Sequence, residues 1–488
     1  MTKRLSLAAL MAFAVSLALP AFAGAQDEVT AEVLKSELDI TWVIVAAVLV
    51  LFMQAGFLFL EIGFSRQKNV GAGVAKILVN LGLVTLAWWA VGSGIASATG
   101  NKVFGTDGFF FSHGQDIAGT IVGGTDSAFM LFGMLFCAVS LAIVWGTTLE
   151  RIKFSAYVIY AAVFGAIIYP LVAHGVYGGG VLADVGGKPV MDFAGSSVVH
   201  LTGAVGGLAA LLLLGPRIGM YGADGKPRAI PGHSMPIAGL GVLILWVGWY
   251  GFNAGSTFGT TDNFFAEVAL TTQLAAAAGA LFAMLVVYMK TKTLDVGMAG
   301  NGAIAGLVGI TAGSGYVEFW AAPIIGAIAG VVVVYGVLTL ERYLDDPVGA
   351  LSAHGLAGIW GTLAVGLFAS PRLILDGAAP GVWYGITGDA SFGSTLGQLG
   401  VQAVGVAAIF ALVFGLSYGT FALLKATIGI RVSEEEELAG LDISTHGMYG
   451  YPESFIPQEE YPVGKFQPSV AGTPVAAPTA TAMSASQS

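Results

Sequence analysis

Apolar residues come in eleven long blocks along the chain, separated by short polar segments. The blocks cover 39–62, 71–97, 127–148, 153–173, 195–215, 236–256, 267–289, 297–314, 320–340, 351–369 and 398–424. A helix needs about 20 apolar residues to cross the roughly 30 Å of hydrocarbon in a bilayer, and most blocks have that length. The pattern therefore predicts an all-α polytopic membrane protein with eleven transmembrane helices.

The N-terminal segment has a different pattern. Lys3 and Arg4 precede a short apolar run, and small residues suited to cleavage follow at 21–25. This order predicts a cleaved signal peptide over residues 1–25, with a short uncleaved first span as the alternative. A chain that starts outside and crosses eleven times ends with its C-terminus in the cytoplasm.

Basic residues give an independent argument for this orientation. Those on the predicted inner side are Arg66, Lys68, Arg151, Lys153, Arg217, Lys226, Arg228, Lys290, Lys292, Arg342, Lys425 and Arg431. The predicted outer loops hold Lys102, Lys188 and Arg372. An excess of Lys and Arg in cytoplasmic loops is typical of inner-membrane proteins, so both arguments predict the same topology.

Composition narrows the class further. The 488 residues are 56% hydrophobic and 10% charged, which excludes a soluble globular chain. The net charge of −10 lies mainly in loops and the tail, and because the chain shows no basic patch, no nucleic-acid partner is expected. The single cysteine, Cys137, excludes an intramolecular disulfide and a cysteine-rich metal site, and no cofactor is expected. Residues 39–425 form the eleven-helix domain, 426–456 an acidic cytoplasmic tail, and 457–488 a disordered end rich in Pro, Ala, Ser and Thr.

Two of the six histidines, His200 and His354, lie inside predicted spans, the fifth and the tenth. Because five spans separate them, their helices cross the membrane in opposite senses, as they would if helices 1–5 and 6–10 were inverted repeats around a central pore. Ionisable groups inside a membrane are costly, so a functional pair is the leading hypothesis, and separate structural hydrogen bonds are the alternative.

A pair of neutral imidazoles can share one N–H···N hydrogen bond and present one donor and one acceptor to a lumen. Such a pair suits a small uncharged polar species or a relayed proton. It suits a metal less well, because we expect no carboxylate or thiol beside it within the spans.

Several segments of the chain resemble one known family. They are MQAGFLFLEIGFSRQKN (53–69), ERIKFSAY (150–157), DFAGSSVVHLTG (192–203), GWYGFNAGS (248–256), GAIAGLVGIT (302–311), DDPVGALSAHGLAGIWG (345–361) and RVSEEEELAGLDISTHG (431–447). Together they resemble ammonium transporters of the Amt/Mep/Rh superfamily, in the Amt branch, from about residue 40 to residue 452. The resemblance implies a homotrimer in the inner (plasma) membrane that takes up ammonium, with one pore per subunit. It also implies that the protein is not an enzyme.

The resemblance also implies roles for individual residues. His200 and His354 match the pore histidine pair, Phe136 and Phe252 a phenylalanine gate, Trp249 a pore-lining ring, Phe132, Tyr177 and Ser256 an outer ammonium site, and Asp192 a residue that supports that site. Tyr177 replaces the family's usual tryptophan. Because tryptophan is the best ring for a cation, we expect a weaker outer site here.

The expected mechanism follows from these roles. Ammonium gives up its proton on entry, ammonia passes the histidines, and the proton crosses separately, so that transport is electrogenic. An electroneutral gas channel, an ammonium sensor that signals through its tail, and a channel for another small neutral species, such as water, carbon dioxide or methylamine, remain alternatives. The tail, by the same resemblance, implies a PII-type signalling protein as a partner at the cytoplasmic face, against a merely solvated acidic segment.

Overall fold

The computed structural model describes residues 30–112 and 124–454, and its regular structure there is helical. The predicted signal peptide (1–25) and the predicted disordered end (457–488) lie outside these residues. Ten described helical segments are long and apolar enough to cross a membrane, and a shorter apolar helix, Val296–Thr311, accompanies them. These segments coincide with the eleven predicted blocks, so the prediction of a polytopic α-helical membrane protein is confirmed.

The α-helices, in chain order, are α2 (Ala31–Phe64), α3 (Val70–Ala87), α4 (Ser93–Ala96), α5 (Gly124–Thr147), α6 (Phe154–Val163), α7 (Tyr169–Val176), α8 (Thr202–Leu214), α9 (Met235–Asn253), α10 (Phe264–Thr291), α11 (Val296–Thr311), α12 (Ala321–Leu340), α13 (Ala357–Phe368), α14 (Val382–Thr387), α15 (Phe392–Thr427), α16 (Glu434–Ala439) and α17 (Leu441–His446). Four π-helical segments interrupt or open spans: η2 (Trp88–Gly92), η3 (Phe164–Ile168), η4 (Ser196–Leu201) and η7 (Leu351–Leu356). Short 3₁₀ turns lie at η1 (Gln67–Asn69), η5 (Ala254–Thr257), η6 (Thr261–Asn263) and η8 (Pro452–Ser454).

The first predicted block started too late. The structure begins α2 at Ala31, where the side chain of Thr30 accepts a hydrogen bond from the backbone N–H of Val33 (3.2 Å). The first two turns of this helix carry polar residues, which hydropathy alone excludes from a span. A capping threonine and an acidic first turn stabilise such an extension without apolar surface.

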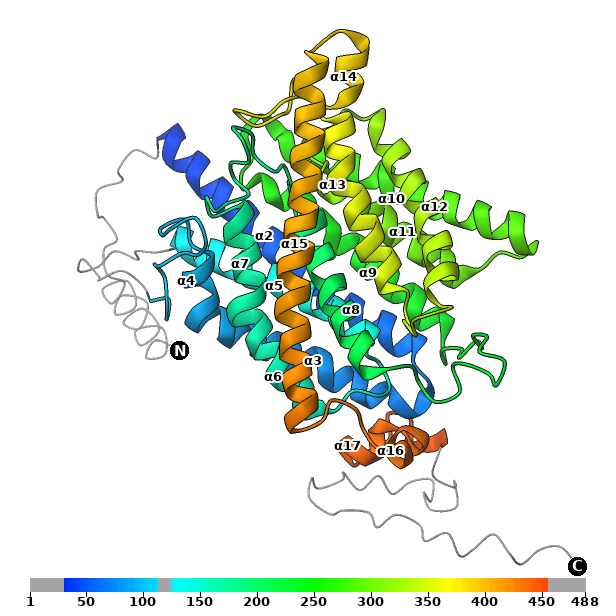
Figure 1. Cartoon of the computed structure of the whole chain (residues 1–488). Helices are drawn as coiled ribbons and strands as arrows, with labels where there is room; N and C mark the ends of the chain where they lie inside the picture. The colour runs from blue at the N-terminus through cyan, green and yellow to red at the C-terminus, as the bar shows by residue number, and fades with distance from the viewer. Residues whose placement is uncertain (1–29, 113–123, 455–488) are drawn as a thin grey trace, which may run out of the picture.

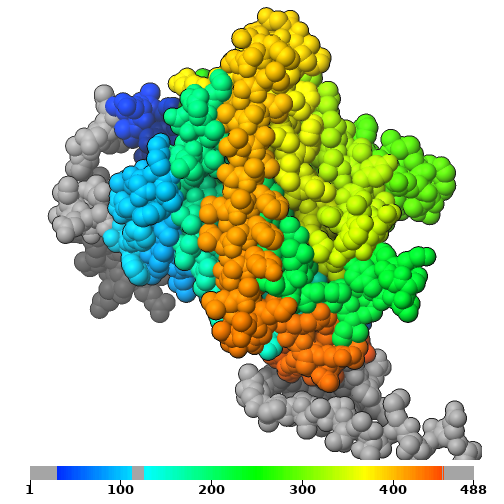
Figure 2. Space-filling model, viewed as in Figure 1, coloured from blue at the N-terminus to red at the C-terminus, as the bar shows by residue number. Residues whose placement is uncertain are grey.

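Figure 1 shows the helices as one bundle with two distinct ends. α14 lies at one end, which we call the α14 end, and the short tail helices α16 and α17 lie at the other, which we call the tail end. The long helix α15 runs along the bundle between the two and packs on α8 and α13. Figure 2 shows α15 covering the face of the bundle that is turned to the viewer.

Glycines allow the helices to approach closely. α2 packs along α9, where a side-chain carbon added at Gly241 would collide with the backbone of Leu60. α10 packs along α12, where the same change at Gly326 would collide with the backbone of Ala275. In lipid the hydrophobic effect does not drive helices together, so close dispersion contacts between their backbones stabilise the bundle instead.

The helices that carry the two membrane histidines run in opposite directions. Arg217, just after α8, forms an ion pair with Asp345, just before η7 (Nη2 to Oδ1, 2.8 Å). The end of α8 and the start of η7 therefore lie together at the tail end. The wider division into two inverted repeats stays a prediction.

Candidate functional site

His200 and His354 meet in the interior of the bundle. Nδ1 of His354 lies 3.2 Å from Nδ1 of His200, and the two ring planes differ by 20°. Both residues are buried, with exposed fractions of 0% and 3%. Since a bond between two ring nitrogens needs one N–H and one lone pair, a neutral pair leaves one outer nitrogen as a donor and the other as an acceptor. Nε2 of His200 is buried and has no protein hydrogen-bond partner.

Each histidine belongs to a π-helical opening turn, η4 or η7. Single π turns widen a helix locally and often occur at functional sites. Asp192 organises the first of them, because its carboxylate accepts hydrogen bonds from the backbone N–H groups of residues 195–198 at 2.8–2.9 Å. Gly195 makes this turn possible with a left-handed φ of 114°, which side chains disfavour. Burial raises the pKa of Asp192, while the four N–H donors favour its charged form.

Four aromatic side chains adjoin the histidines, and two of them, Trp249 and Phe252, contact His200 directly. Trp249 stacks on His200, with ring centroids 5.0 Å apart, and donates a hydrogen bond to Oγ1 of Thr311 (2.9 Å). Phe252 stacks on Phe136, with centroids 4.0 Å apart and planes 10° apart. Phe132 follows at 4.4 Å from Phe136. We call Phe132, Phe136, Phe252, Trp249, His200 and His354 the ring column.

The remaining predicted outer-site residues lie differently. Ser256 is 9% exposed, and its hydroxyl donates to the carbonyl oxygen of Phe252 (2.8 Å), so its lone pairs stay free to accept. Tyr177 ends α7 and is 48% exposed. Among the described ring pairs, none joins Tyr177 to Phe132 directly.

Sequence reasoning missed four residues at this site. Phe258 packs edge-on against both Phe132 and Phe129, at centroid distances of 5.4 and 5.2 Å. It has a left-handed φ of 53°, a conformation that its residue type gives no reason to expect. Phe57 of α2 lies against His354, with centroids 6.1 Å apart, and Thr311 holds Trp249.

The fourth missed residue did leave a signal. Asp346 accepts a hydrogen bond from the N–H of Leu351 (2.7 Å), at the start of η7. It precedes His354 by eight residues, as Asp192 precedes His200. Comparison of the two segments would have found it.

One expectation about the spans was wrong. Glu61 lies within the candidate span Ala31–Phe64 and is fully buried, so the spans do contain a buried carboxylate. The block pattern hid it because a single acidic residue near the end of an apolar run barely changes the hydropathy. Within residues 30–112 and 124–454, no group of three or more metal-ligating side chains is present.

A cluster of charged side chains lies at the tail end of the bundle. Arg217 binds both carboxylate oxygens of Asp345 (2.9 and 2.8 Å), and Arg66 binds Glu150 (2.6 Å). Arg151 is fully buried and donates to the carbonyl oxygens of Leu149, Gly215 and Asp345 at 2.7–2.9 Å. We call Arg66, Glu150, Arg151, Arg217 and Asp345 the ionic collar.

The ionic collar holds its carboxylates ionised. Burial alone would raise the pKa of Glu150, but Arg217 and Arg66 bring it below its usual range. Burial likewise opposes ionisation of Asp345, and its hydrogen bonds with Arg217 and the charge of Arg151 lower its pKa overall. Beside the collar a cavity of about 500 Å³ opens among Asn301, Val348 and Ser352, two residues from His354.

The tail docks onto this end of its own chain. Lys68 donates to the carbonyl oxygen of Glu437 (2.9 Å), and the carboxylate of Asp442 accepts from the N–H of Ala72 (2.9 Å). The ring of Tyr451 reaches His233, whose Nε2 lies 3.1 Å from the tyrosine hydroxyl. The predicted tail is therefore an ordered structural element up to Ser454 rather than a free solvated segment.

The fold and the site together define a class: a multi-pass α-helical membrane protein with paired imidazoles at its centre. Comparisons with known proteins define the family. The sequence profile of the Ammonium Transporter Family matches residues 41–451. The ammonium transporter Amt2 of Archaeoglobus fulgidus is 42% identical over 476 residues, which is 94% of this chain and 98% of the relative. The ammonium transporter of Bacillus subtilis is 34% identical and covers 85% of this chain and 99% of its own.

Solved structures agree. A protein described as a sensor Amt protein has a TM-score of 0.77 and 34% identity, over 85% of this chain and 99% of its own. Mep2 of Saccharomyces cerevisiae has a TM-score of 0.72 and 27% identity, over 86% and 93%. The chain belongs to the ammonium transporter family. Its members are transporters, so the prediction that the protein is not an enzyme is confirmed.

Proposed function

We propose that the protein moves ammonium across the membrane by binding the ion at the α14 end, removing its proton, and passing ammonia along the ring column. The proton crosses separately, by way of the histidine pair, so that net charge moves. Phe132, Ser256 and Tyr177 receive the ion, with Asp192 supporting that region. Phe136 and Phe252 form the gate, and Trp249 lines the path to His200 and His354.

One observation carries this proposal: the 3.2 Å contact between the two buried Nδ1 atoms. A shared N–H···N bond fixes opposite tautomers, so the two outer nitrogens offer one donor and one acceptor to a passing molecule. Ammonia has three N–H donors and one lone pair, and it fits such a pair in either direction. When the outer acceptor nitrogen of the pair takes up a proton, the shared proton moves to the other ring, and that ring releases its own outer N–H proton. The two tautomers are then exchanged and one proton has passed through the same residues.

The stacked gate explains why the ion should lose its charge first. Phe136 is 5% exposed and Phe252 fully buried, so the ring column offers apolar faces where water would otherwise hold the ion. A bare charge at the centre of a membrane costs at least about 2.5–3.5 kcal/mol. Ammonia avoids this cost.

The distribution of charged and apolar residues suggests the orientation and the assembly of the protein in the membrane. The ionic collar and the basic residues Lys68, Arg431 and Lys153 lie at the tail end, where the positive-inside rule favours the cytoplasm. We therefore place the C-terminus in the cytoplasm, the N-terminus outside, and the protein in the inner membrane. The exposed apolar residues of the bundle suit both lipid and a homotrimer with one pore in each subunit.

The test is the transient current in proteoliposomes after an ammonium pulse, with potassium and methylammonium as comparison ions. The proposal predicts a saturable current for ammonium and none for potassium. A flux of ammonia detected by an internal pH dye without any current would establish an electroneutral gas channel instead.

A second candidate function is ammonium sensing. It is favoured by the likeness to the solved sensor Amt protein, which matches 85% of this chain. In that case the chain would bind ammonium, carry neither current nor flux, and change the docking of its tail. Binding measured by calorimetry on the same proteoliposome preparation separates this case from transport.

The docked tail also suggests a partner. We propose that a PII-type signalling protein binds the tail end, over the cavity beside the ionic collar, and closes it. Retention of a PII-type protein on the immobilised transporter, lost when residues 434–454 are deleted, is the expected result. Equal retention by both forms, or by neither, would remove the partner.

A further inference from the structure

Glu61 is a buried carboxylate without a protein partner. It lies on the last turn of α2, it is 0% exposed, and neither carboxylate oxygen has a hydrogen-bond partner among the described residues. A buried carboxylate in that condition is expensive, because nothing replaces the water it has lost. None of the roles proposed for the ring column uses the Glu61 carboxylate.

Lys76 of α3 is the matching base. It is 2% exposed, and its charge is the one that acts on Glu61. Within the described residues, no ion pair and no hydrogen bond joins the two side chains directly. The two residues lie at the same level of the α2–α3 interface, between the contact of Asn80 with Gln54 (3.0 Å) and the close approach of Gly73 to Ile62. Both carboxylate oxygens of Glu61 are left without a partner there.

Buried hydrogen bonds and ring packing hold the residues around Glu61 and Lys76 in place. Tyr157 donates a hydrogen bond to the carbonyl oxygen of Lys76, and its ring packs on Trp145 at 4.0 Å. One turn further along α3, Asn80 binds Gln54 of α2 (3.0 Å) and accepts from Trp145 (3.1 Å). The α2–α3–α5 interface therefore carries a row of buried polar groups beside the apolar core.

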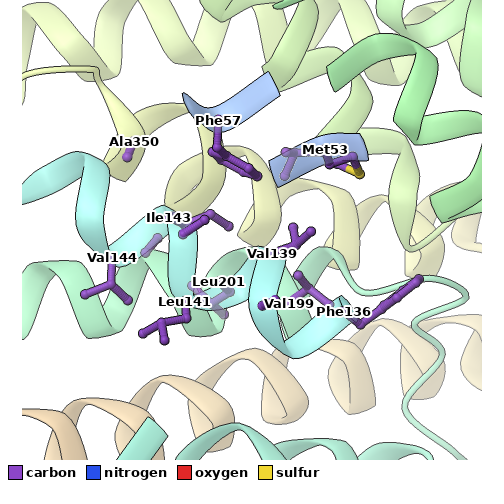
Figure 3. Packing of buried hydrophobic residues seen from close by; sticks show 14 of the residues in the cluster. Met53, Phe57, Phe136, Val139, Leu141, Ile143, Val144, Val199, Leu201 and Ala350 are labelled. Atoms are coloured by element: carbon purple, nitrogen blue, oxygen red, sulfur yellow. The ribbon is translucent and has the colours of Figure 1, made fainter. Parts of the chain in front are cut away.

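This row lies next to the histidine pair. Phe57, whose ring contacts His354, precedes Glu61 by four residues and so lies on the same face of α2, one turn nearer the centre. Figure 3 shows Phe57 and Met53 of α2 within the apolar cluster that α5 completes. On the other side, a carbon added at Gly146 would touch both Glu61 Oε1 (3.8 Å) and Val348 (2.9 Å), which lines the tail-end cavity.

We propose that Glu61 and Lys76 hold one small neutral molecule between them. This molecule is water or ammonia, each of which has hydrogen-bond donors and a lone pair. The site exchanges protons with the tail end. The molecule donates to the Glu61 carboxylate and accepts from the Lys76 ammonium. It satisfies the atoms that the protein leaves without partners. The proton role rests on the proposed transport of ammonium, whereas the binding site does not.

The proton step balances without a further reactant. A proton leaves Lys76 Nζ for the bridging molecule as that molecule's own proton moves to Glu61 Oε. The bridging molecule is regenerated, and the side chains become a neutral amine and a neutral acid. In the neighbouring tail, burial lowers the pKa of His446, the charge of Asp442 opposes that shift, and the charge of Lys76 adds to it.

Infrared difference spectroscopy on the intact protein in lipid tests the binding. Glu61→Gln identifies the Glu61 carboxylate or carboxyl bands as those lost from the wild type. If water bridges the pair, those bands shift when H₂O is exchanged for H₂¹⁸O and not when ¹⁴N-ammonium is exchanged for ¹⁵N-ammonium; if ammonia does, the reverse holds. Bands insensitive to both isotopes would overturn the site.

Glu61→Gln, Lys76→Met and the double variant test the proton role. We expect each to lower the ammonium current at least several-fold while ammonia flux, read by an internal pH dye, changes less. A matched control is Lys35→Met/Asp39→Asn, which removes an exposed acid–base pair of the same helix that bonds directly (2.6 Å).

The outcomes separate the two proposals. No ammonium current in the wild type would remove the transport mechanism and leave the infrared test of binding intact. A wild-type current that all three variants keep unchanged would remove the proton role of Glu61 and Lys76. Because Glu61→Gln alone leaves a buried lysine without its partner, the double variant guards against a loss that reflects folding only.

Discussion

The ring column and the ionic collar are two buried regions of one bundle that treat polar groups in opposite ways. In the ionic collar, every charged side chain finds a partner, with Arg217 bound to Asp345 through two nitrogens. In the ring column, His200 keeps a buried nitrogen without a protein partner, and the rest of the column is mostly apolar. The collar lies at the tail end, and the column crosses the interior.

This difference suggests that the ionic collar has a structural role and the ring column a role in transport. Charges that are fully paired hold loops together and leave nothing free to interact with a moving molecule. A group whose second partner is missing costs stability unless something else binds it. Of the buried groups without a hydrogen-bond partner, we propose that His200 and Glu61 are where small molecules interact, whereas the ion pairs of the collar anchor the chain.

Removing one member of the ionic collar should give the largest effect on stability. Arg217→Ala leaves Asp345 and Glu150 buried without their shared cation, and breaking a buried pair in this way costs about 3–5 kcal/mol. The apparent melting temperature of the purified protein in detergent measures the loss. The matched control is Lys226→Ala, whose side chain is 81% exposed and 3.9 Å from Asp224, with an expected cost below about 1 kcal/mol. Equal melting temperatures for both variants would contradict the role of the collar.

Acid should weaken the ionic collar. The pKa values of Glu150 and Asp345 lie below their ordinary values of 4.5 and 3.8, so their stabilisation is fully present above pH 4.5 and is lost as the pH falls below it. The melting temperature of the wild type should be lower below pH 4.5 than near neutral pH. This difference should be smaller for Arg217→Ala. A steeper fall in the variant would show that other groups cause the acid sensitivity.

Phe258 offers a smaller test at the outer end of the ring column. Its ring covers Phe132 edge-on, and such aromatic pairs contribute about 0.5–1.5 kcal/mol. If Phe258 completes the outer ammonium site, Phe258→Ala should raise the half-saturating ammonium concentration of the current by about twofold to tenfold. Phe410→Ala on α15, where the ring stacks on Phe414 at 5.9 Å, serves as the control and should leave it unchanged.

Tyr177→Trp should have the smallest effect. The side chain is half exposed, and at exposed sites a cation above a ring gains only about 0.5–1 kcal/mol. The half-saturating concentration should therefore fall by no more than about fivefold. A larger gain would mean that Tyr177 closes over the bound ion, next to Phe132, when ammonium arrives.

The sequence predicted the spans well because apolar length is a strong signal, as Val296–Thr311 against the predicted 297–314 illustrates. It predicted the histidine pair because a polar residue in an apolar block is conspicuous. It missed Phe57 and Phe258, since one phenylalanine among many carries no sign of its neighbours. Glu61 was overlooked for the opposite reason: near the end of a block an acidic residue suggests a boundary, and only the structure shows that it is buried within the bundle.

The account depends most on the claim that His200 and His354 act as one unit in transport. The decisive measurement is the ammonium and potassium current in proteoliposomes of His200→Ala, His354→Ala and the double variant. The account predicts that each single variant loses selective ammonium current as completely as the double variant, because the shared Nδ1 contact needs both rings. Selective ammonium currents that survive in the double variant would contradict it.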